Sequence, residues 1–367
     1  MTNKKDKIIF VYPYEQQEGA INNASKIRPY MMELAFKEAF GKNLLIRNGK
    51  QRFKNIPQNG VKGLYLESIN RPFFIQRIIE KDWRIFSDYW NLWRLKKRGI
   101  KLSVFYRDAF WAGDFLFENY FFLVALLLKG CFKLEWILFN KIFDIIYLPS
   151  LELADFMGEK ERSKYEVLLP GCDTPKINEI SPLAPKKNIQ SKITLLYSGG
   201  ISPPLNDISL MLDLIGGRDN IHLIIIIRKN EWDKYGSYYQ WNFLNVDVIV
   251  GKDKNQLHEY YAISDACLML YPSHSYRYLA MPYKAFEAVG FGVPLLSFSD
   301  CVMGDFIKKN KLGLSMNYEE FLQSFSHTSE LLNKLQKCSN NVLCYANDNT
   351  WEHRVRQIVK DFDKKLK

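Results

Sequence analysis

Short apolar runs alternate with longer amphipathic stretches along most of this chain. The runs have the length of buried strands, and the stretches between them have the spacing of helices that cover a sheet. Strands are predicted at residues 8–12, 43–47, 63–66, 101–106, 143–148 and 166–171 in the first half, and at 193–200, 222–227, 246–250, 266–270 and 293–297 in the second. This alternation predicts an α/β fold with parallel sheets.

Long helices are predicted between and after these strands. The clearest are residues 24–40, 72–98 and 116–139, a helix from about residue 207, and a mostly helical region from 318 to 367. The apolar segment 116–139 has two interpretations, because it can pack on the sheet or lie partly on a membrane surface. We favour packing on the sheet, since apolar stripes usually face a core.

The chain divides at a polar segment that contains three prolines. Residues 172–192 have the composition of an interdomain linker. A chain of 367 residues is also too long for one ordinary core. We therefore predict an N-terminal domain at 1–171 and a C-terminal domain at 193–349, with a final helix at 350–367 that packs back on the N-terminal domain.

The composition is that of a soluble globular protein with a basic surface. Hydrophobic residues make up 47% and charged residues 25% of the chain, and the formal net charge is +11. Residues 1–180 hold 29 Lys and Arg against 21 Asp and Glu, and this half is also rich in aromatic residues. That combination favours contact with an anionic membrane, with a merely basic soluble surface as the alternative. No zinc-finger or RNP signature is present, so nucleic acid is not an expected partner.

Targeting signals and metal-ligand patterns are absent from the sequence. Residues 1–7 contain no signal-peptide core, and the longest uncharged apolar run, 120–128, is too short to span a bilayer. The six scattered Cys residues indicate free, mostly buried thiols in a reducing compartment, and the five His residues form no cluster. Asp361-Phe-Asp363 resembles a metal-binding motif, but we interpret it as a solvated helix face. We expect a cytoplasmic protein, peripheral to the inner face of the cell membrane.

The stretch from Tyr271 to Ser297 carries the clearest candidate chemistry. It follows a buried strand, and Pro282 suits the first turn of a new helix. Lys284 and Glu287 then lie three residues apart on one face of that helix, before two glycines end it. A strand, a polar loop, a helix start and another strand form the layout of a doubly wound sheet, whose ligands lie beyond the carboxyl ends of the strands.

These residues resemble a known family. The string Met281-Pro-x-Lys284-x-Phe-Glu287-x-x-x-x-Gly292-x-Pro294 is similar to the donor-binding segment of family-4-type glycosyltransferases of bacterial surface-polysaccharide synthesis. The resemblance implies the GT-B fold, in which two Rossmann-like domains face each other across a cleft. It also implies that Glu287 holds the ribose hydroxyls of a nucleotide sugar. Many relatives carry another Glu eight positions earlier, and because this chain has Leu279 there, that residue's role in a retaining reaction has no counterpart here.

The rest of the donor site should lie on strand ends of the second domain. Gly199 and Gly200 allow close approach of a phosphate to the backbone, although a simple turn is the default interpretation of such a pair. Arg228 and Lys284 are candidates to neutralise the leaving diphosphate, with an ordinary strand-terminal charge pair as the alternative for Arg228.

The family resemblance places three further donor contacts. It implies that backbone groups at Gly251 hold the nucleotide base, and that Tyr271 and Ser273 border the sugar and phosphate.

The first domain is implied to bind the acceptor. Gly19, in the loop after the first strand, resembles a glycine that lets acceptor and donor phosphate approach each other. Asp108 sits where relatives often place a residue that faces the transferred sugar, and it is our first candidate for the general base of an inverting reaction. Glu15 and Glu18 are rivals for that role, and a salt bridge with Arg107 is the alternative role for Asp108.

These residues together predict a metal-independent glycosyltransferase of the hexosyltransferase type. It would move a sugar from a nucleoside-diphosphate donor to a lipid-linked saccharide acceptor in surface-polysaccharide synthesis. No cofactor is expected besides the donor substrate. Two alternatives stay open: a sugar-nucleotide epimerase of the same fold, and a non-catalytic partner subunit that binds nucleotide sugars.

Overall fold

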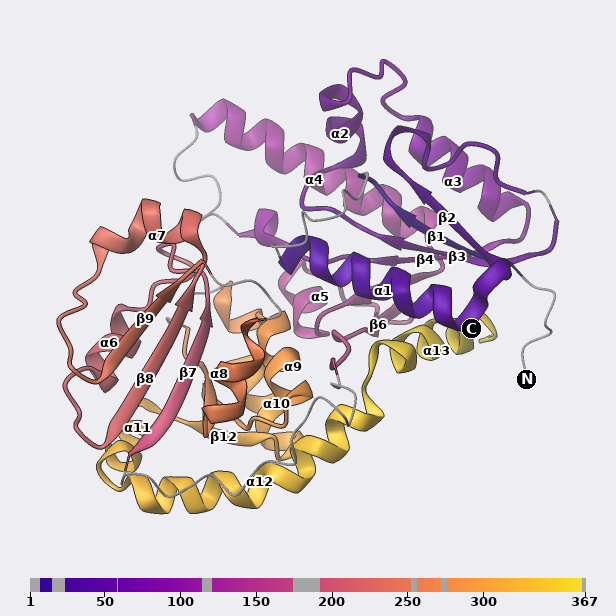
Figure 1. Cartoon of the computed structure of the whole chain (residues 1–367). Helices are drawn as coiled ribbons and strands as arrows, with labels where there is room; N and C mark the ends of the chain where they lie inside the picture. Colours follow the sequence, from indigo (N-terminus) through magenta and orange to yellow (C-terminus); the bar gives the residue numbers. More distant parts are fainter. Residues whose placement is uncertain are drawn as a thin grey trace. The chain divides into compact units, whose positions relative to one another are not determined.

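The protein is built from two compact units. The computed structural model describes residues 7–14, 24–57, 59–113, 121–173, 192–251, 256–271 and 276–364. Unit 1 comprises Met1–Pro170 together with Trp351–Lys367, and unit 2 comprises Gly171–Thr350. Each unit contains one six-stranded sheet in which every neighbouring pair of strands is parallel (Figure 1). The α/β prediction is therefore confirmed.

The sheet of unit 1 has the strand order β2-β1-β3-β4-β5-β6. Its strands are β1 (Lys7–Tyr12), β2 (Leu44–Asn48), β3 (Val61–Glu67), β4 (Lys101–Phe105), β5 (Ile145–Leu148) and β6 (Tyr165–Val167). The interior strand β1 is a continuous apolar run, and residues 8–11 are all completely buried. Continuous burial follows because helices cover both faces of a parallel sheet.

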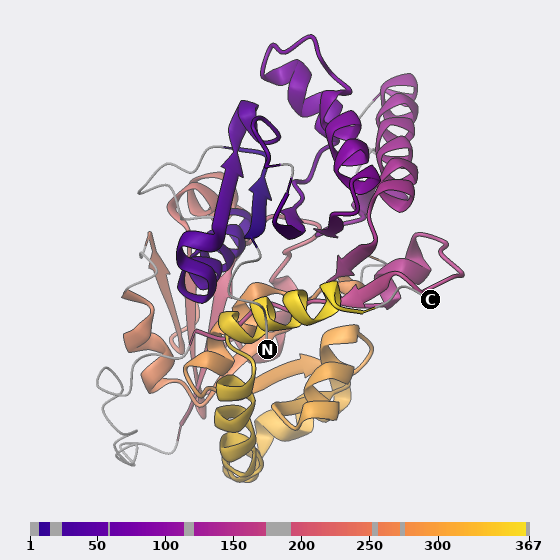
Figure 2. The same cartoon turned by 90° about the vertical axis from the view of Figure 1, so that its right-hand side faces the viewer.

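The helices of unit 1 come from both ends of the chain. They are α1 (Ala24–Phe40), α2 (Phe73–Ile79), α3 (Ser87–Lys97), α4 (Phe122–Ile142), α5 (Glu152–Phe156) and α13 (Trp351–Phe362). Figure 2 shows α1 on one side of the strands and α3 and α4 on the other. Helix α13 contacts α1 and β3, and a Cβ at Gly63 would lie 2.6 Å from the Phe362 ring. The close approach of α13 to the sheet therefore requires a glycine at this position.

Two sequence expectations for unit 1 are wrong. The single helix predicted at 72–98 is interrupted, because Lys81 adopts a left-handed backbone (φ +56°) and the Asp82 carboxylate accepts a hydrogen bond from the Arg84 backbone N–H. Asp361, expected on a solvated face, is 4% exposed and accepts a hydrogen bond from the Tyr147 hydroxyl at 2.9 Å. Asp361 lies on the buried side of the amphipathic helix α13, and the Asp361-Phe-Asp363 string alone does not indicate this position.

Helix α4 follows the packing interpretation over only part of its length. Its C-terminal half packs in unit 1, where Phe132, Trp136 and Phe139 are buried. Its N-terminal half does not, since Phe122 is 72% exposed and Leu127 is 69% exposed. Packing on the sheet was therefore the right prediction for only half of this helix.

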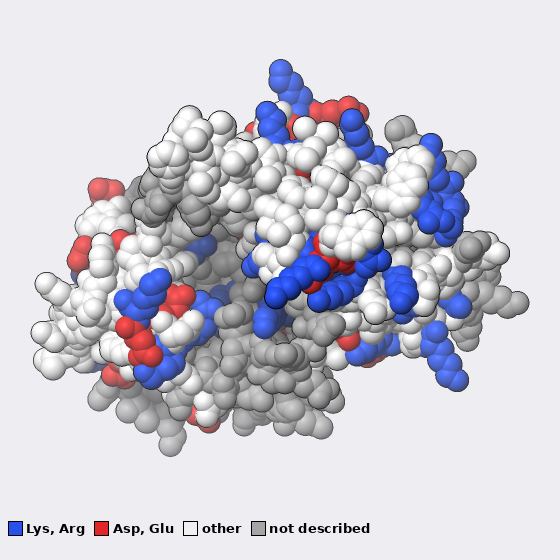
Figure 3. Space-filling model, turned by 90° about the horizontal axis from the view of Figure 1, so that it is seen from above, with Lys and Arg blue, Asp and Glu red and all other residues white. Residues whose placement is uncertain are grey.

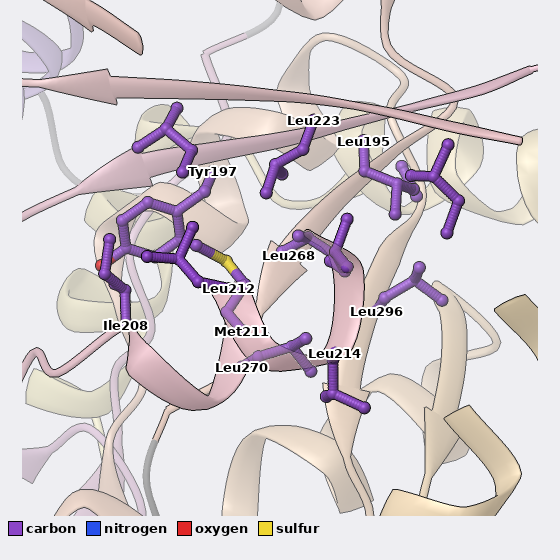
Figure 4. Close-up of a cluster of buried hydrophobic side chains, with 14 of the residues drawn as sticks. Leu195, Tyr197, Ile208, Met211, Leu212, Leu214, Leu223, Leu268, Leu270 and Leu296 are labelled. Carbon is purple, nitrogen blue, oxygen red and sulfur yellow. The ribbon is translucent and has the colours of Figure 1, made fainter. Parts of the chain in front are cut away.

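The sheet of unit 2 has the strand order β12-β11-β10-β7-β8-β9. Its strands are β7 (Ile193–Gly199), β8 (Ile221–Ile227), β9 (Val246–Val250), β10 (Ala266–Met269), β11 (Leu295–Phe298) and β12 (Gly313–Met316). A continuous cluster of buried aliphatic side chains joins strands β7, β8 and β10 to helix α6 (Figure 4). This core fixes the positions of the strand ends that carry the candidate site.

The helices of unit 2 follow the strands in the usual alternation. They are α6 (Ser209–Ile215), α7 (Lys229–Tyr235), α8 (His258–Ile263), α9 (Tyr283–Gly290), α10 (Val302–Asn310), α11 (Tyr318–Ser326) and α12 (Thr328–Asp348). Pro282, predicted in the first turn of its helix, is instead the N-cap of α9. All six cysteines of the chain are free thiols, and the expectation that most of them are buried is wrong, since only Cys172 and Cys267 are buried.

Candidate functional site

The carboxyl edge of the unit 2 sheet gathers four of the residues predicted on the donor side. Gly199 ends β7, Arg228 follows β8, Gly251 follows β9, and Tyr271 lies two residues beyond β10. The strands β10, β7, β8 and β9 are parallel neighbours, so their ends meet along one edge. The strand order reverses between β7 and β10, and such a reversal is where sheets of this kind bind ligands.

Glu287 is the buried carboxylate near this edge. It lies in α9 and is 1% exposed. One oxygen, Oε2, accepts hydrogen bonds from Lys284 Nζ at 2.7 Å and from the Tyr261 hydroxyl at 2.8 Å. The other oxygen, Oε1, is buried and has no hydrogen-bond partner among the described residues. The side chain is thus anchored through one oxygen and leaves the other available to accept.

Tyr261 fixes this carboxylate and was missed in the sequence. It comes from α8, and its ring stacks on Phe291 with centroids 4.8 Å apart. Burial raises the pKa of the Tyr261 phenol well above its ordinary value, and the charge of Glu287 raises it further. The phenol therefore keeps its proton and remains a donor to Glu287. Tyr261 lies 26 residues before Glu287, so no local spacing indicates the contact.

Lys284 is engaged in an ion pair. Its ammonium contacts Glu287, and 24% of its side chain is exposed. The sequence predicted that Lys284 would help to neutralise a diphosphate. In the structure a phosphate would have to share this ammonium with the Glu287 carboxylate.

The turn at Gly199 and Gly200 is held by Glu231, another residue that the sequence did not indicate. The Glu231 carboxylate accepts hydrogen bonds from the Ile201 backbone N–H at 3.1 Å and from Arg228 Nη2 at 2.8 Å. A Cβ at Gly200 would lie 3.3 Å from the same carboxylate. The turn is therefore as crowded as a glycine pair suggests. One of its backbone N–H groups, that of Ile201, already donates to the Glu231 carboxylate.

Arg277 is a further cation at this edge, and the sequence did not indicate it. Its guanidinium lies 4.0 Å from the centroid of the Tyr271 ring. It also donates hydrogen bonds to the Leu205 carbonyl and the Asn206 side chain, which join the loop after β10 to the segment before α6. Tyr271 and Arg277 line a small cavity together with Cys301. Stacking and hydrogen bonds together fix this guanidinium in place.

Asp108 lies beyond the carboxyl end of β4 in unit 1. It is partly buried beside Tyr106, whose pKa is raised well above its ordinary value, mainly by burial and to a smaller extent by the Asp108 charge. The backbone N–H of Arg107 donates to Ser68 Oγ at 3.4 Å, which links the ends of β3 and β4. Four other predicted residues lie outside the described part of the chain: Glu15, Glu18, Gly19 and Ser273.

A buried ion pair that no sequence pattern indicated lies at the same edge of unit 1. Arg28 Nε donates to Glu67 Oε1 at 3.2 Å, and the two side chains are 6% and 0% exposed. The Tyr65 hydroxyl donates to the same Glu67 oxygen at 2.5 Å. The Arg28 guanidinium also lies 3.5 Å from the centroid of the Phe105 ring.

Comparison with solved structures identifies the architecture. The structure of WaaG, a glycosyltransferase involved in lipopolysaccharide biosynthesis, matches with a TM-score of 0.56 over 98% of this chain and 100% of that chain, at 14% sequence identity. The chain has the GT-B fold. This confirms the fold that the donor-segment resemblance implied.

Two further GT-B structures match at similarly low identity. Anabaena HepE in complex with UDP and glucose has a TM-score of 0.57 at 12% identity and covers 97% of this chain and 99% of its own. Sucrose-phosphate synthase from Thermosynechococcus elongatus has a TM-score of 0.63 at 10% identity, with 97% and 98% covered. No protein-family model and no curated protein sequence matches the chain. The likeness therefore concerns the GT-B fold alone.

Within this GT-B chain, the described residues form no group of three or more His, Cys, Asp or Glu side chains arranged to hold a metal ion. The helices that the structure describes also include none with the length and hydropathy needed to cross a membrane.

Proposed function

We propose that this chain is a glycosyltransferase that moves a sugar from a nucleoside-diphosphate donor to a lipid-linked saccharide acceptor in surface-polysaccharide synthesis. The observation that carries the proposal is Glu287, a buried carboxylate near the carboxyl edge of the unit 2 sheet. One of its oxygens is anchored, and the other has no hydrogen-bond partner among the residues that the structure describes. A ribose hydroxyl is a suitable donor to Oε1, because an unpaired buried acceptor costs about 1–3 kcal/mol. HepE, which shares the fold, has been solved with UDP-glucose, and this supports a nucleotide-sugar donor.

The remaining donor contacts follow from the same edge. Positive charge from Arg228 and Lys284, with backbone N–H groups at Gly199 and Gly200, would stabilise the diphosphate as it leaves. Gly251 would border the nucleotide base, while Tyr271 and Ser273 would border the sugar and phosphate.

On the acceptor side, Asp108 is the first candidate to take the proton of the attacking hydroxyl, with Glu18 as its rival. Gly19 would let acceptor and donor phosphate approach each other. The transfer forms a bond from the acceptor oxygen to the sugar and breaks the bond from the sugar to the diphosphate, which leaves with the negative charge.

An apolar surface on unit 1 supports an acceptor that is anchored in a membrane. Helices α2, α3 and α4 are adjacent, because Glu135 of α4 accepts hydrogen bonds from the Phe73 backbone of α2 and the Tyr89 hydroxyl of α3. The exposed large apolar residues on and beside these helices are Ile78, Ile79, Trp83, Phe86, Trp90, Trp93, Phe121, Phe122, Leu123, Val124, Leu126, Leu127, Leu134 and Ile137. A patch of this kind on a monomer marks an interaction surface.

The charges around this patch favour an anionic membrane as its partner. The acidic residues of 73–98 and 121–142 are all turned inward, since the side chains of Glu80 and Asp82 are 9% exposed, Asp88 is completely buried and Glu135 is 2% exposed. The exposed charged residues are all basic: Lys81, Arg84, Arg94, Lys97, Arg98, Lys133 and Lys141. Figure 3 looks onto this end of the molecule and shows uncharged surface bordered by Lys and Arg side chains. We propose that the patch lies on the cytoplasmic face of the membrane.

The donor site is tested by calorimetric binding of a panel of nucleoside diphosphates. We expect one nucleotide to bind the wild type and to lose at least tenfold in affinity with Glu287→Ala, because the ribose acceptor is removed. Glu330→Ala, which changes an exposed carboxylate of α12, is the matched control and should leave binding unchanged. If no nucleotide binds the wild type, or if Glu287→Ala binds as well as the wild type, the donor site is wrong.

Membrane contact is tested by sedimentation with vesicles. We expect vesicles that contain phosphatidylglycerol to retain the protein at low salt, and the retention to fall as salt screens the basic side chains. Vesicles of phosphatidylcholine alone should retain much less. Equal retention by both vesicles would show that the basic residues do not contribute.

A second candidate function is a subunit that binds nucleotide sugars without transferring them. It is favoured by Leu279, which is 7% exposed and supplies no carboxylate where many relatives have one. Hydrolysis or transfer of the bound donor, followed by release of nucleoside diphosphate, distinguishes the enzyme from the binding subunit.

A further inference from the structure

Four polar atoms near the carboxyl ends of the unit 1 strands are buried without a hydrogen-bond partner among the described residues. Three of them, Arg28 Nη1, Glu67 Oε2 and Arg107 Nη2, belong to residues at or next to the paired ends of β3 and β4, and the fourth, Ser150 Oγ, lies two residues beyond β5. Arg28 and Glu67 satisfy each other through different atoms, so their ion pair leaves one donor and one acceptor unused. A buried polar atom without a partner costs about 1–3 kcal/mol, and three at one edge of a sheet need an explanation.

These residues come together because of the strand register. Glu67 ends β3 and is the Cα partner of Phe105, the last residue of β4. Arg28 stacks on that same Phe105 ring, and Arg107 follows it by two residues. The backbone of Arg107 is tied to Ser68, the residue after Glu67. Arg28 of α1 and Arg107, which follows β4, thus lie near the ends of the paired strands β3 and β4, although they are far apart in the sequence.

The location is the point where ligands bind to sheets of this topology. In the order β2-β1-β3-β4, the chain leaves β1 for β2 on one side and continues to β3 on the other. The reversal lies between β1 and β3, and Glu67 ends β3. Tyr14, just beyond β1, has its pKa raised to about 12 by burial; the nearby Arg107 cation lowers that pKa and the Glu67 carboxylate raises it. Tyr14 therefore lies within electrostatic range of both Arg107 and Glu67.

The free atoms define the chemistry of a ligand. Two guanidinium groups and one carboxylate leave one net positive charge, so an anion is preferred over a neutral molecule. The two free N–H groups require acceptor oxygens, and Glu67 Oε2 requires a donor such as a hydroxyl. A phosphate or carboxylate alone satisfies only the arginines, whereas a sugar that carries an anionic group satisfies all three atoms.

We propose that Arg28, Glu67 and Arg107 form a binding site for an anionic sugar, whose charged group accepts from the two arginines and whose neighbouring hydroxyl donates to Glu67. Its source is either a hexuronate or a sugar phosphate, which share this chemistry. The statement that this sugar belongs to the acceptor rests on the proposed glycosyltransferase function; the binding site itself does not.

Calorimetry with four probes tests the site: D-glucuronate, D-glucose 6-phosphate, D-glucose and inorganic phosphate. We expect at least one anionic sugar to bind the wild type tenfold more tightly than either glucose or phosphate, and the tighter of the two identifies the source. Arg107→Gln should weaken that binding at least tenfold. Arg28→Lys keeps the charge opposite Glu67 but loses the forked donor, and should weaken binding several-fold.

The matched control is Arg98→Gln. Arg98 is exposed at the C-terminal end of α3, which leads into the start of β4, so it lies at the opposite edge of the sheet. Its substitution should leave affinity unchanged, and melting temperatures verify that each variant is folded. The proposal is overturned if the anionic sugars bind no tighter than glucose or phosphate, or if folded Arg107→Gln and Arg28→Lys both bind like the wild type.

The two proposals fail in different ways. Glu287→Gln should lose nucleotide binding and keep the affinity for anionic sugars, because the residues belong to different units. Anionic-sugar binding that disappears in Glu287→Gln would assign the sugar to the donor site and overturn the unit 1 site. Anionic-sugar binding through Arg107 without any nucleotide binding would keep the unit 1 site and exclude the glycosyltransferase.

Discussion

Each of the two units contains its own six-stranded parallel sheet, but the units differ in how many ionisable side chains they bury. Among the described residues of unit 1, nine with ionisable side chains are buried: Arg28, Glu33, Arg52, Glu67, Arg77, Asp88, Glu135, Arg354 and Asp361. Among the described residues of unit 2, Glu287 is the one buried charged residue. In the described part of unit 2, buried charged side chains therefore do not connect the structural elements as they do in unit 1. This difference supports the proposed ligand-binding role of Glu287.

Unit 1 uses its buried charges to join elements that are distant in sequence. Asp88 at the start of α3 accepts hydrogen bonds from Arg52 and Arg77, while Arg52 also contacts Glu80 after α2. Most atoms of this network are satisfied inside the protein, so its role is structural. The Arg28, Glu67 and Arg107 cluster differs from it by its unpartnered atoms. Substitutions can test whether the Asp88 network stabilises the fold, whereas the Arg28, Glu67 and Arg107 cluster binds a ligand as proposed.

The largest effect is expected from Asp88→Ala. The substitution leaves the completely buried Arg52 and the buried Arg77 without their shared carboxylate, and breaking such a buried pair costs about 3–5 kcal/mol. Urea unfolding followed by tryptophan fluorescence measures the loss. Glu330→Ala, which removes an exposed i,i+4 pair in unit 2, should change stability by less than about 0.5 kcal/mol. Equal effects of the two substitutions would contradict the structural role of the network.

The next effect concerns the pH dependence of unit 1. Burial raises the pKa of Glu135 from its ordinary value of 4.5 to about 8, partly offset by hydrogen bonds from Phe73 and Tyr89. Between these two values the folded protein holds a proton that the unfolded chain has lost, so stability falls as pH rises from about 5 through 8. Glu135→Gln should remove this pH dependence. In the wild type the free energy of unfolding should fall by a total on the order of 2–4 kcal/mol across that pH range.

Denaturant unfolding at a series of pH values measures this slope. Lys133→Gln, on the exposed side of the same helix, is the control and should keep the wild-type slope. A Glu135→Gln protein with an unchanged slope would show that Glu135 does not titrate in this range.

A smaller effect is expected at Gly63, where the C-terminal helix α13 packs on the unit 1 sheet. Gly63→Ala places a methyl group against the Phe362 ring and should destabilise the protein by about 1–3 kcal/mol. Gly130→Ala is the opposite case, because Gly130 is an exposed helical glycine with no atom within 4 Å of an added Cβ. It should stabilise by about 0.5–1 kcal/mol. Thermal unfolding of both variants distinguishes close packing at Gly63 from a general effect of alanine.

The smallest effect concerns the exposed apolar surface of α2–α4 in unit 1. Substitutions there and in unit 2 can be compared directly. Leu126→Glu puts a negative charge on the exposed half of α4 and should reduce retention on phosphatidylglycerol vesicles about tenfold, or about 1.4 kcal/mol. Leu244→Glu introduces the same charge at a fully exposed leucine of unit 2 and should leave retention unchanged. If both substitutions reduce retention equally, the effect reflects net charge and not the α2–α4 surface.

The sequence was most informative where the evidence is local. Strand β1 and helix α1 were predicted at nearly their observed bounds. The strand is a continuous apolar run, and such a run is a local property of the sequence. The pairing of Lys284 with Glu287 also follows from a three-residue helical spacing. The break between α2 and α3 was missed, because the backbone of Lys81 departs from a helix where the local pattern still favours one.

The residues that complete the candidate sites could not be predicted in this way. Tyr261 reaches Glu287 from 26 residues away, and Arg28 reaches Glu67 from 39 residues away. Such contacts depend on which helix covers which strand, and no periodicity in one segment encodes the position of another.

The amino-acid sequence by itself therefore determined the α/β class, the donor-segment motif and the basic, aromatic character of the first half. Only the tertiary structure decided that one Glu287 oxygen has no partner among the described residues, that Arg28, Glu67 and Arg107 lie at one sheet edge, and that the N-terminal half of α4 is exposed. The physical reason is that periodicity sets the type of each element, whereas burial and hydrogen-bond partners are set by packing between elements far apart in the chain.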